Sequence, residues 1–285
     1  WIDRPEEYSK LIKAILSEDT DRNVALTALH GMGGIGKTTI AKMMCHDKTI
    51  TYAFPDGIFW VTLGREVRDV TDKIKTIGTT LGDEDIHYSN QERAISRLRN
   101  LLHNKSVLIV LDDVWDASLA EHFLTTSPSS RWLITTRKNQ VVSKLEATEV
   151  RIGTFTREQA IALLQEFVPN ETLKDLRGVA KRLGNHPMAL QIVGKQLQKQ
   201  KRSASEWLRQ YDDIAKIRES ILSKERDANL TICFDLSMQD LPDQYPLLYH
   251  LIGIFPEDEW IPQDIILRLW QIQLPELTSD ECREL

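Results

Sequence analysis

A glycine-rich segment, Gly31–Thr39, constrains this chain more than any other stretch. It follows an apolar run, Val24–His30, that is typical of a buried strand, and residues 40–44 continue with helical spacing. The segment reads Gly-Met-Gly-Gly-Ile-Gly-Lys-Thr-Thr and matches the pattern G-x-x-x-x-G-K-[ST]. Its glycines let successive backbone N–H groups surround an anion, and the helix N-terminus behind them adds its dipole. We therefore expect a phosphate-binding loop, in which Lys37 reaches the outer phosphates and the Thr38 hydroxyl ligates Mg²⁺.

The first half of the chain alternates strand-like and helix-like patterns. Continuous runs rich in β-branched and aromatic residues predict strands, whereas apolar residues repeating every three or four positions predict helices. After the first strand, the predicted strands are Gly57–Leu63, Val107–Leu111, Trp132–Thr136 and Glu149–Ile152. The predicted helices lie within residues 67–81, 95–102, 117–123 and 141–145. Gly82 is the predicted stop of the first of them. Such alternation predicts an α/β fold, in which a parallel sheet is covered by helices on both faces.

The middle of the chain has the pattern of a small helical domain. Capping boxes formed by Thr156 with Gln159, and by Ser203 with Glu206, predict the first and the last of its helices. Pro187 fits the first turn of another helix, where a backbone N–H is not required. The apolar side chains interpreted as core, rather than as a partner surface, include Phe167, Leu176, Trp207 and Trp270.

A third segment follows a charged stretch, Lys216–Asp227, which we interpret as a boundary. Helical patterns lie at 232–236, 247–252 and 265–270, and Phe255-Pro256 forms a turn between the last two. Thr278 with Glu281 forms a capping box. We therefore divide the chain into domains of residues 1–153, 154–226 and 227–285. Because the sequence starts with Trp1 instead of Met and ends one turn into a predicted helix, we expect a piece of a longer protein.

An apolar strand that ends in two aspartates, Asp112 and Asp113, is a second signal for phosphate chemistry. Beside a phosphate-binding loop, Asp112 would hold Mg²⁺ through water, and Asp113 would orient or polarise an attacking water. Taken alone, two such aspartates are more often a helix cap and a surface turn. Arg137 ends the strand motif Leu133–Arg137, at the sheet edge where ligands bind. It is either a contact for a γ-phosphate or a solvated arginine at a strand end.

Composition and charge argue against several other classes of protein. A hydrophobic fraction of 41% fills real cores, which excludes wholesale disorder. A net charge of −6 disfavours a nucleic-acid partner, and no apolar stretch approaches the ~20 residues of a membrane span, so no membrane partner is expected. The irregularly spaced Cys45, Cys233 and Cys282 form neither a disulfide framework nor a zinc site. They indicate a reducing compartment, most simply the cytoplasm.

Six motifs, in their order along the chain, resemble the NB-ARC family. These proteins are the nucleotide switches of plant disease-resistance proteins and apoptotic protease-activating factors, within the STAND class of NTPases. The motifs are Gly31–Thr39, Leu111–Trp115, Ile134–Arg137, Gly184–Leu190, Phe255–Asp258 and Leu267–Trp270. The resemblance covers essentially the whole chain. It implies a P-loop NTPase domain with a parallel sheet, followed by a small helical domain and a partial winged-helix domain.

The resemblance also implies roles for single residues. Pro187 would pack on the adenine or ribose, and the backbone around Ile2 and Arg4 would lie along the adenine. Arg137 would be the sensor that distinguishes ATP from ADP. Asn185-His186 stands before the proline where the family has leucine, and we interpret His186 as an exposed loop histidine rather than a pH-sensitive addition. The implied nucleotide-binding residues are Gly31, Met32, Gly33, Gly34, Ile35, Gly36, Lys37, Thr38, Thr39, Arg137, Pro187, Ile2 and Arg4; the metal ligands are Thr38 and Asp112, and the catalytic residue is Asp113.

We therefore expect a switch that binds ADP or ATP with Mg²⁺ and is at most a slow ATPase. By resemblance, ADP would clamp the helical and winged-helix domains onto the P-loop domain, and ATP would favour an open form that oligomerises. The resemblance implies effector and sensor domains outside this sequence, and a Met-His-Asp motif that the sequence lacks. The alternatives are a turnover P-loop ATPase or small-molecule kinase and a STAND-type transcriptional regulator. The sequence shows no apparent arginine finger, which would indicate the turnover enzyme. It also shows no apparent basic recognition helix, which would indicate the transcriptional regulator.

Overall fold

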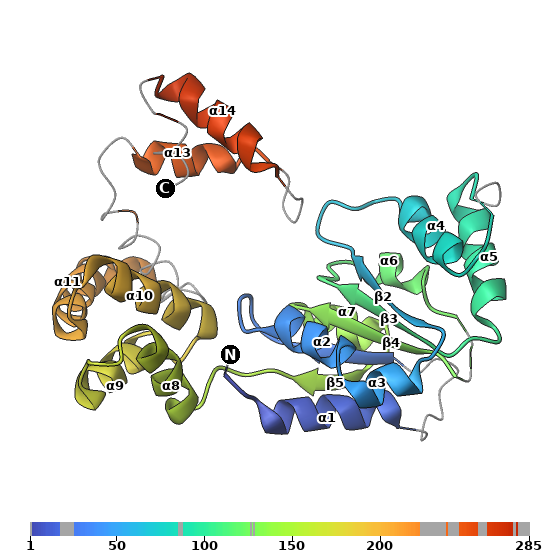
Figure 1. The fold of residues 1–285 in the computed structure, drawn as a ribbon, viewed down its shortest axis with the longest axis horizontal. Helices are drawn as coiled ribbons and strands as arrows, with labels where there is room; N and C mark the ends of the chain where they lie inside the picture. Colours follow the sequence, from blue (N-terminus) through green and yellow to red (C-terminus); the bar gives the residue numbers. More distant parts are fainter. Residues whose placement is uncertain are drawn as a thin grey trace. The chain divides into compact units, whose positions relative to one another are not determined.

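The computed structural model describes residues 2–17, 26–84, 88–125, 127, 129–222, 238, 245–255, 261–275 and 278. The chain divides into two compact units, Asp3–Gly153 and Thr154–Leu285, and Ile2 belongs to the second (Figure 1). The elements of the first unit are α1 (Pro5–Leu16), β1 (Leu26–His30), α2 (Lys37–Cys45), α3 (Lys48–Ala53), β2 (Gly57–Thr62), α4 (Thr71–Thr80), α5 (Gln91–Leu102), β3 (Val107–Asp112), α6 (Ala117–Glu121), β4 (Arg131–Thr136), α7 (Asn139–Lys144) and β5 (Thr148–Arg151).

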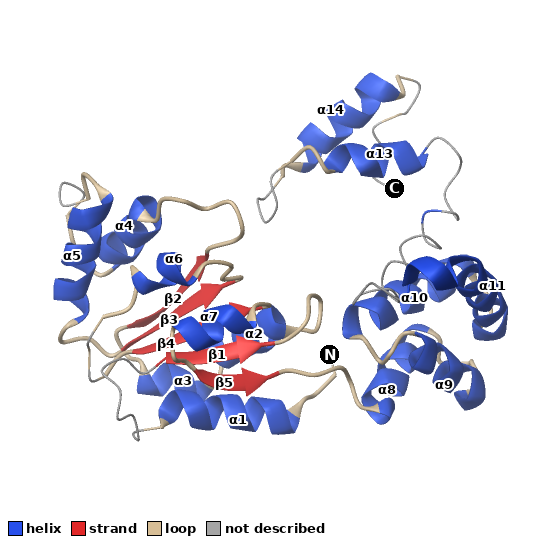
Figure 2. Cartoon of the chain, turned by 180° about the vertical axis from the view of Figure 1, so that it is seen from behind, coloured by secondary structure: helices blue, strands red, loops and turns tan. Residues whose placement is uncertain are grey.

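The first unit is built on a five-stranded parallel sheet with the order β2-β3-β4-β1-β5 (Figure 2). The predicted α/β fold class is confirmed. β4 lies between β1 and β3, although it follows both in sequence. Its register pairs Thr136 with His30 on one side and Ile134 with Leu111 on the other. The ends of β1, β4 and β3 therefore share one edge of the sheet.

β3 shows how the sheet is covered on both faces, because it is buried along its whole length. Val107, Ile109 and Leu111 belong to a core cluster shared with helices α4–α7. Leu108 and Val110 belong to a separate cluster shared with α1–α3. Successive side chains of a strand point to opposite faces, so a continuous apolar run satisfies both layers.

Three helices of the first unit differ from the sequence-based prediction. α1 and α3 were not predicted. α1 has proline at its first position and buries Leu11 and Ile15, which are one helical turn apart and form only a short stripe. α4 begins at Thr71 and not near residue 67, because the Asp69 carboxylate accepts a hydrogen bond from the Thr71 N–H (2.7 Å). Val70 is buried but precedes this helix.

The described secondary-structure elements of the second unit are all helices. Its elements are α8 (Arg157–Phe167), α9 (Leu173–Arg182), α10 (Pro187–Gln200), α11 (Ala204–Leu222), α13 (Tyr245–Ile252) and α14 (Gln263–Gln273). The predicted capping boxes at Thr156 and Ser203 are present, and Pro187 occupies the first turn of α10. Leu176 and Trp207 are buried in the core of α8–α11, as expected.

α13 and α14 form a smaller pair with its own apolar contact. Trp270 of α14 is buried against Leu248, and its indole N–H donates to the Leu248 carbonyl (2.9 Å). The predicted helices at 247–252 and 265–270 are therefore confirmed. The predictions at 232–236, at the turn after Phe255 and at the Thr278 capping box fall wholly or partly outside the described residues.

Gly194 on α10 permits a close approach to Phe167 of α8. A Cβ at this position would lie 2.4 Å from Phe167 Cδ2. Gly194→Ala gains helix propensity, about 1 kcal/mol, but overpacks the contact by roughly 1–3 kcal/mol. We expect a net loss of up to about 2 kcal/mol in the free energy of unfolding, measured by denaturant titration. Lys195→Ala, at the exposed neighbouring position, is the control. A variant more stable than the wild type would contradict this packing.

Candidate functional site

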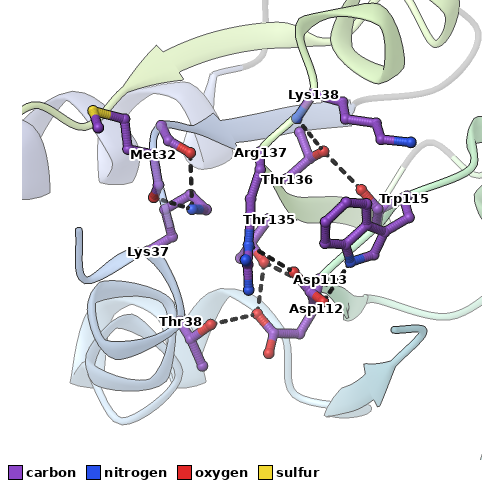
Figure 3. A network of polar contacts seen from close by, with 12 residues as sticks. Met32, Lys37, Thr38, Asp112, Asp113, Trp115, Thr135, Thr136, Arg137 and Lys138 are labelled. Atoms are coloured by element: carbon purple, nitrogen blue, oxygen red, sulfur yellow. Dashed lines mark hydrogen bonds and ion pairs between the residues drawn. The ribbon is translucent and has the colours of Figure 1, made fainter. Parts of the chain in front are cut away.

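The three chemistry-bearing segments meet at the carboxyl edge of the sheet (Figure 3). The glycine-rich loop follows β1, the two aspartates follow or end β3, and Arg137 follows β4. β4 is the neighbour of both other strands, so it brings its own side chains between the loop and the aspartates. Ligands of open parallel sheets bind at this edge. The arrangement thus follows from strand order, which spacing along the chain does not reveal.

The glycine-rich loop needs glycine at two positions for different reasons. Gly36 has φ of 101° and precedes α2 without a side-chain cap, so the first N–H groups of the helix have no capping side chain. Gly31 packs directly on the end of β5, because a Cβ there would lie 2.6 Å from the Ile152 carbonyl oxygen. Uncapped N–H groups at a helix N-terminus form a binding site for an anion such as phosphate.

Lys37 lies at the start of α2 and is almost buried, with 7% of its surface exposed. Its ammonium donates hydrogen bonds to the carbonyls of Gly31 (2.9 Å) and Met32 (2.7 Å), so it folds back over the loop (Figure 3). Burial, and then the Arg137 guanidinium, lower the pKa of Lys37 to about 8, while Asp113 opposes the shift. A buried cation held at this cost is well suited to bind an anion.

Asp112 ends β3 and is the centre of the hydrogen bonds at this edge. Its Oδ1 accepts from the hydroxyls of Thr38 on α2 (2.9 Å) and Thr135 on β4 (2.6 Å). The carboxylate is 6% exposed, and both donors are oxygen groups. The sequence paired Thr38 with Asp112 as metal ligands, and these two side chains are indeed adjacent. Hard oxygen donors of this kind suit Mg²⁺, which takes few protein ligands besides substrate phosphates.

Asp113 has an unusual backbone conformation, with φ of 52°. Its N–H donates to Thr135 Oγ1 (2.9 Å), and its Oδ2 accepts from the Trp115 indole N–H (2.6 Å). Its Oδ1 lies 3.6 Å from Arg137 Nε. Aspartate tolerates the left-handed region better than most residues, and such conformations cluster at functional sites. The carboxylate is thus held on both oxygens.

Arg137 reaches from the end of β4 toward the loop and Asp113. A Cβ on Gly33 would lie 3.3 Å from its Nη1, so the guanidinium lies close over the loop. Its Cζ is also 5.3 Å from the centroid of the Trp115 ring. The side chain is 47% exposed. It contacts site residues and solvent together, unlike a wholly solvated arginine at a strand end.

The remaining predicted nucleotide contacts are distributed over the two units. Pro187 and Ile2 belong to the second unit, where Ile2 packs against the core of α8–α11. Arg4 belongs to the first unit, and its Nη1 donates to the Gly153 carbonyl (2.8 Å). The expectation that His186 is an exposed loop histidine is wrong. It is 7% exposed and caps α10, because its Nδ1 accepts from the Ala189 N–H at 3.5 Å.

Two side chains of the site were missed as functional residues. Thr135 links Asp112 to the backbone of Asp113, and Trp115 contacts both Asp113 and Arg137. The two hydroxyl residues Thr135 and Thr136, which end the apolar run of β4, were the available signal for Thr135. For Trp115, the available signal was its place at the end of the motif Leu111–Trp115, which does not reveal its contacts with Asp113 and Arg137.

A phosphate-binding loop beside an acidic strand end, on a parallel sheet, is characteristic of P-loop NTPases, and this fold and site define that class. Within it, the chain belongs to the NB-ARC family, since the profile of the NB-ARC domain matches residues 6–174. Family membership supports a nucleotide-binding switch in general terms.

The relatives include plant and animal proteins. A probable disease resistance RPP8-like protein 2 of Arabidopsis thaliana is 27% identical over 93% of this chain and 30% of its own length. The apoptotic protease-activating factor 1 of Danio rerio is 26% identical over 97% of this chain and 23% of its own length. The chain thus spans less than a third of either relative.

The solved structures support the fold. The crystal structure of a STAND protein with a tetratricopeptide repeat sensor, from Pyrococcus horikoshii, has a TM-score of 0.61. It is 18% identical and covers 95% of this chain and 37% of that protein. Among the described residues of the present chain, no helix is both long and apolar enough to cross a membrane.

The lowered pKa of Lys37 makes stability depend on pH in a definite direction. In the unfolded chain the lysine stays charged up to its ordinary pKa of 10.5, so the cost of burying the charge is fully present below pH 8. It is relieved as the pH rises from about 8 toward 10. In ligand-free protein at pH 7, we expect Lys37→Met to raise the free energy of unfolding by roughly 1–2 kcal/mol, because lost hydrogen bonds offset part of the gain.

The measurement is thermal or denaturant unfolding between pH 7 and pH 10, with nucleotide and phosphate absent. The advantage of Lys37→Met over the wild type should shrink as the pH rises. Lys42→Met is the matched control, because Lys42 lies exposed on the same helix. If Lys37→Met were less stable than the wild type at pH 7, the lysine would instead be a net stabilising group.

Proposed function

We propose that this chain is a switch module that binds ADP or ATP with Mg²⁺ and responds to the presence of the γ-phosphate. One observation carries the proposal: Lys37, Thr38, Asp112, Asp113 and Arg137 converge at one edge of the sheet. Thr38 donates to Asp112, Thr135 links Asp112 to Asp113, Asp113 pairs with Arg137, and Lys37 donates to the loop carbonyls. Cations and uncapped N–H groups stand at one side of this group and carboxylates at the other. A nucleotide phosphate with its metal ion satisfies both sides.

Arg137 is the proposed sensor of the γ-phosphate. Without a ligand its guanidinium pairs with the Asp113 carboxylate, with 3.6 Å between Nε and Oδ1. A γ-phosphate brings additional negative charge and competes with Asp113 for the guanidinium, whereas ADP leaves the pair intact. A ligand shifts a conformational equilibrium only by its differential contacts with the two states. The exchange of partners by Arg137 is such a differential contact.

Thr38 and Asp112 are the proposed ligands of Mg²⁺. A bound Mg²⁺ would supply positive charge that offsets the charge of the phosphates. Thr38 donates to Asp112, so its hydroxyl oxygen keeps lone pairs that can face a cation. Thr135, on the neighbouring strand β4, donates to the same carboxylate and fixes its orientation. Protein groups around a metal ligand tune it in this way.

Slow hydrolysis is proposed to use Asp113. Its carboxylate is held by Trp115 and lies beside Arg137, so it can orient a water toward the phosphate without rotating freely.

We propose that Pro187 couples the nucleotide to the second unit by packing on the adenine or ribose. The backbone around Ile2 and Arg4 would lie along the adenine. The ADP state would hold the units together, and the ATP state would release them for self-association.

The relatives support the biological setting of this proposal. One is a plant disease-resistance protein and another is an apoptotic protease-activating factor. We propose that the chain serves as the switch of a longer immune or cell-death protein, with effector and sensor domains on either side. A turnover P-loop ATPase is the alternative, because an exposed arginine such as Arg137 could also assist fast hydrolysis.

Identification of retained nucleotide tests the proposal. We expect purified protein, once denatured, to release close to one equivalent of ADP or ATP, identified by chromatography. Lys37→Ala should lose this nucleotide, because removing a charged hydrogen-bond donor to phosphate costs roughly tenfold or more in affinity. Lys42→Ala, on the exposed side of the same helix, should retain it. Wild-type protein that binds neither nucleotide in titration would contradict the proposal, and fast turnover would favour the ATPase alternative.

Hydrolysis by the bound site is tested separately with Asp113→Asn. The amide keeps the shape and an acceptor for Trp115 but cannot act as a base. We expect nucleotide affinity to stay within about threefold and single-turnover hydrolysis of ATP to fall by about 10². Asp116→Asn is the control, because Asp116 caps the nearby helix α6 outside the cluster. An unchanged hydrolysis rate in Asp113→Asn would remove Asp113 from the reaction.

A further inference from the structure

Trp115 lies among three cationic side chains from two other loops. The Arg137 guanidinium lies 5.3 Å from the centroid of its ring, the Lys138 ammonium 5.1 Å and the Arg65 guanidinium 5.5 Å. Arg65 follows β2, whereas the other two cations follow β4. The indole N–H donates to Asp113 (Figure 3). One aromatic ring therefore contacts the acidic and the basic sides of the candidate site.

This environment distinguishes Trp115 from a core tryptophan. Trp132, in the same unit, is fully buried among apolar residues and donates its N–H to the Phe123 carbonyl (3.0 Å). Trp115 is only partly buried, and it contacts a carboxylate and three cations. Its role is therefore not explained by filling the core.

The contacts form a closed triangle of three side chains. Trp115 donates to Oδ2 of Asp113, Arg137 pairs with Oδ1 of the same carboxylate, and the guanidinium lies near the indole ring. A hydrogen bond to a carboxylate is charge-assisted, and an indole ring attracts a cation. Each member of the triangle is thus held by the other two. Moving Arg137 toward a phosphate would break two of its contacts here.

We propose that Trp115 is a positioning residue for recognition of the γ-phosphate. It orients the Asp113 carboxylate through its N–H, and it holds the Arg137 guanidinium near its ring until a γ-phosphate draws that group away. This inference rests on the proposed nucleotide-binding function of the same site. Trp115 acts through Asp113 and Arg137, so its loss should affect ATP much more than ADP.

The test measures the affinities of ADP and of the ATP analogue with an imido bridge between its β- and γ-phosphates, both with Mg²⁺. Trp115→Phe keeps a ring face but loses the N–H, and Trp115→Leu loses both. We expect affinity for the analogue to rise roughly threefold in Trp115→Phe and roughly tenfold in Trp115→Leu, because the ring contact that Arg137 gives up for the γ-phosphate is weakened in the first variant and lost in the second. Affinity for ADP should stay within about twofold in both, because ADP leaves Arg137 on Asp113 and the ring.

Tryptophan fluorescence gives a readout that a merely structural role would not move. The analogue, and not ADP, should change the emission of the wild type, since a cation leaves the ring of Trp115. Trp115→Phe and Arg137→Ala should both lose this change. Trp60→Phe is the matched control, because Trp60 also lies near a cation, Lys42 at 5.7 Å, and also donates its N–H to a neighbouring side chain. That variant should keep both the fluorescence change and the ratio of affinities.

The outcomes separate this inference from the function on which it rests. Loss of the analogue-specific change in Trp115→Phe, with a raised preference for the analogue, would support the positioning role. Wild-type binding of both nucleotides with an unchanged affinity ratio in Trp115→Phe would overturn the role of Trp115 and leave the switch standing. Wild-type protein that binds neither nucleotide would overturn the switch and this inference with it. If Trp115→Leu does not fold, Trp115→Phe and the fluorescence decide the question.

Discussion

The buried Asp112 carboxylate imposes the constraint on which the rest of the site depends. A carboxylate taken out of water is costly unless donors satisfy it, and here Thr38 and Thr135 supply hydroxyls from α2 and β4. Thr135 also accepts from the N–H of Asp113. Through these hydrogen bonds one carboxylate fixes the start of the loop helix, the end of the central strand and the unusual backbone of Asp113. The sheet order matters because only β4, between the other two strands, can make both links.

The charges at this edge are arranged for a ligand more than for the stability of the empty fold. Lys37 is buried and donates hydrogen bonds to two loop carbonyls, and Asp113 has a left-handed backbone. Burial of an ammonium and a strained φ each lower stability, and such departures from local preference are typical of functional sites. The ion pair of Asp113 with Arg137 balances part of the charge while remaining accessible to a competing anion. A site of this kind favours a bound anion without requiring large rearrangement.

The parts that could be predicted are those encoded by local patterns. Apolar runs located the strands, and the glycine-rich segment located the loop, because each depends on residues adjacent in sequence. α1 was missed since its buried stripe is essentially Leu11 and Ile15, and His186 was misjudged because a loop position does not reveal a capping role. The contacts of Thr135 and Trp115 could not be predicted, because they depend on strand order and on side chains distant in sequence.

The end of β5 offers a physical connection between the loop and the boundary of the first unit. Gly31 packs so closely on the Ile152 carbonyl that a methyl group would not fit, and the Ile152 N–H donates to His30 (2.8 Å). One residue later, the Gly153 carbonyl accepts from Arg4, and the second unit begins at Thr154. The first residue of the loop therefore touches the backbone immediately before the boundary. Energetic coupling requires packed contacts of this kind with two alternative arrangements. If the loop changes conformation when phosphate binds, the strand end at Ile152 must adjust with it, because the contact leaves no free space for independent movement.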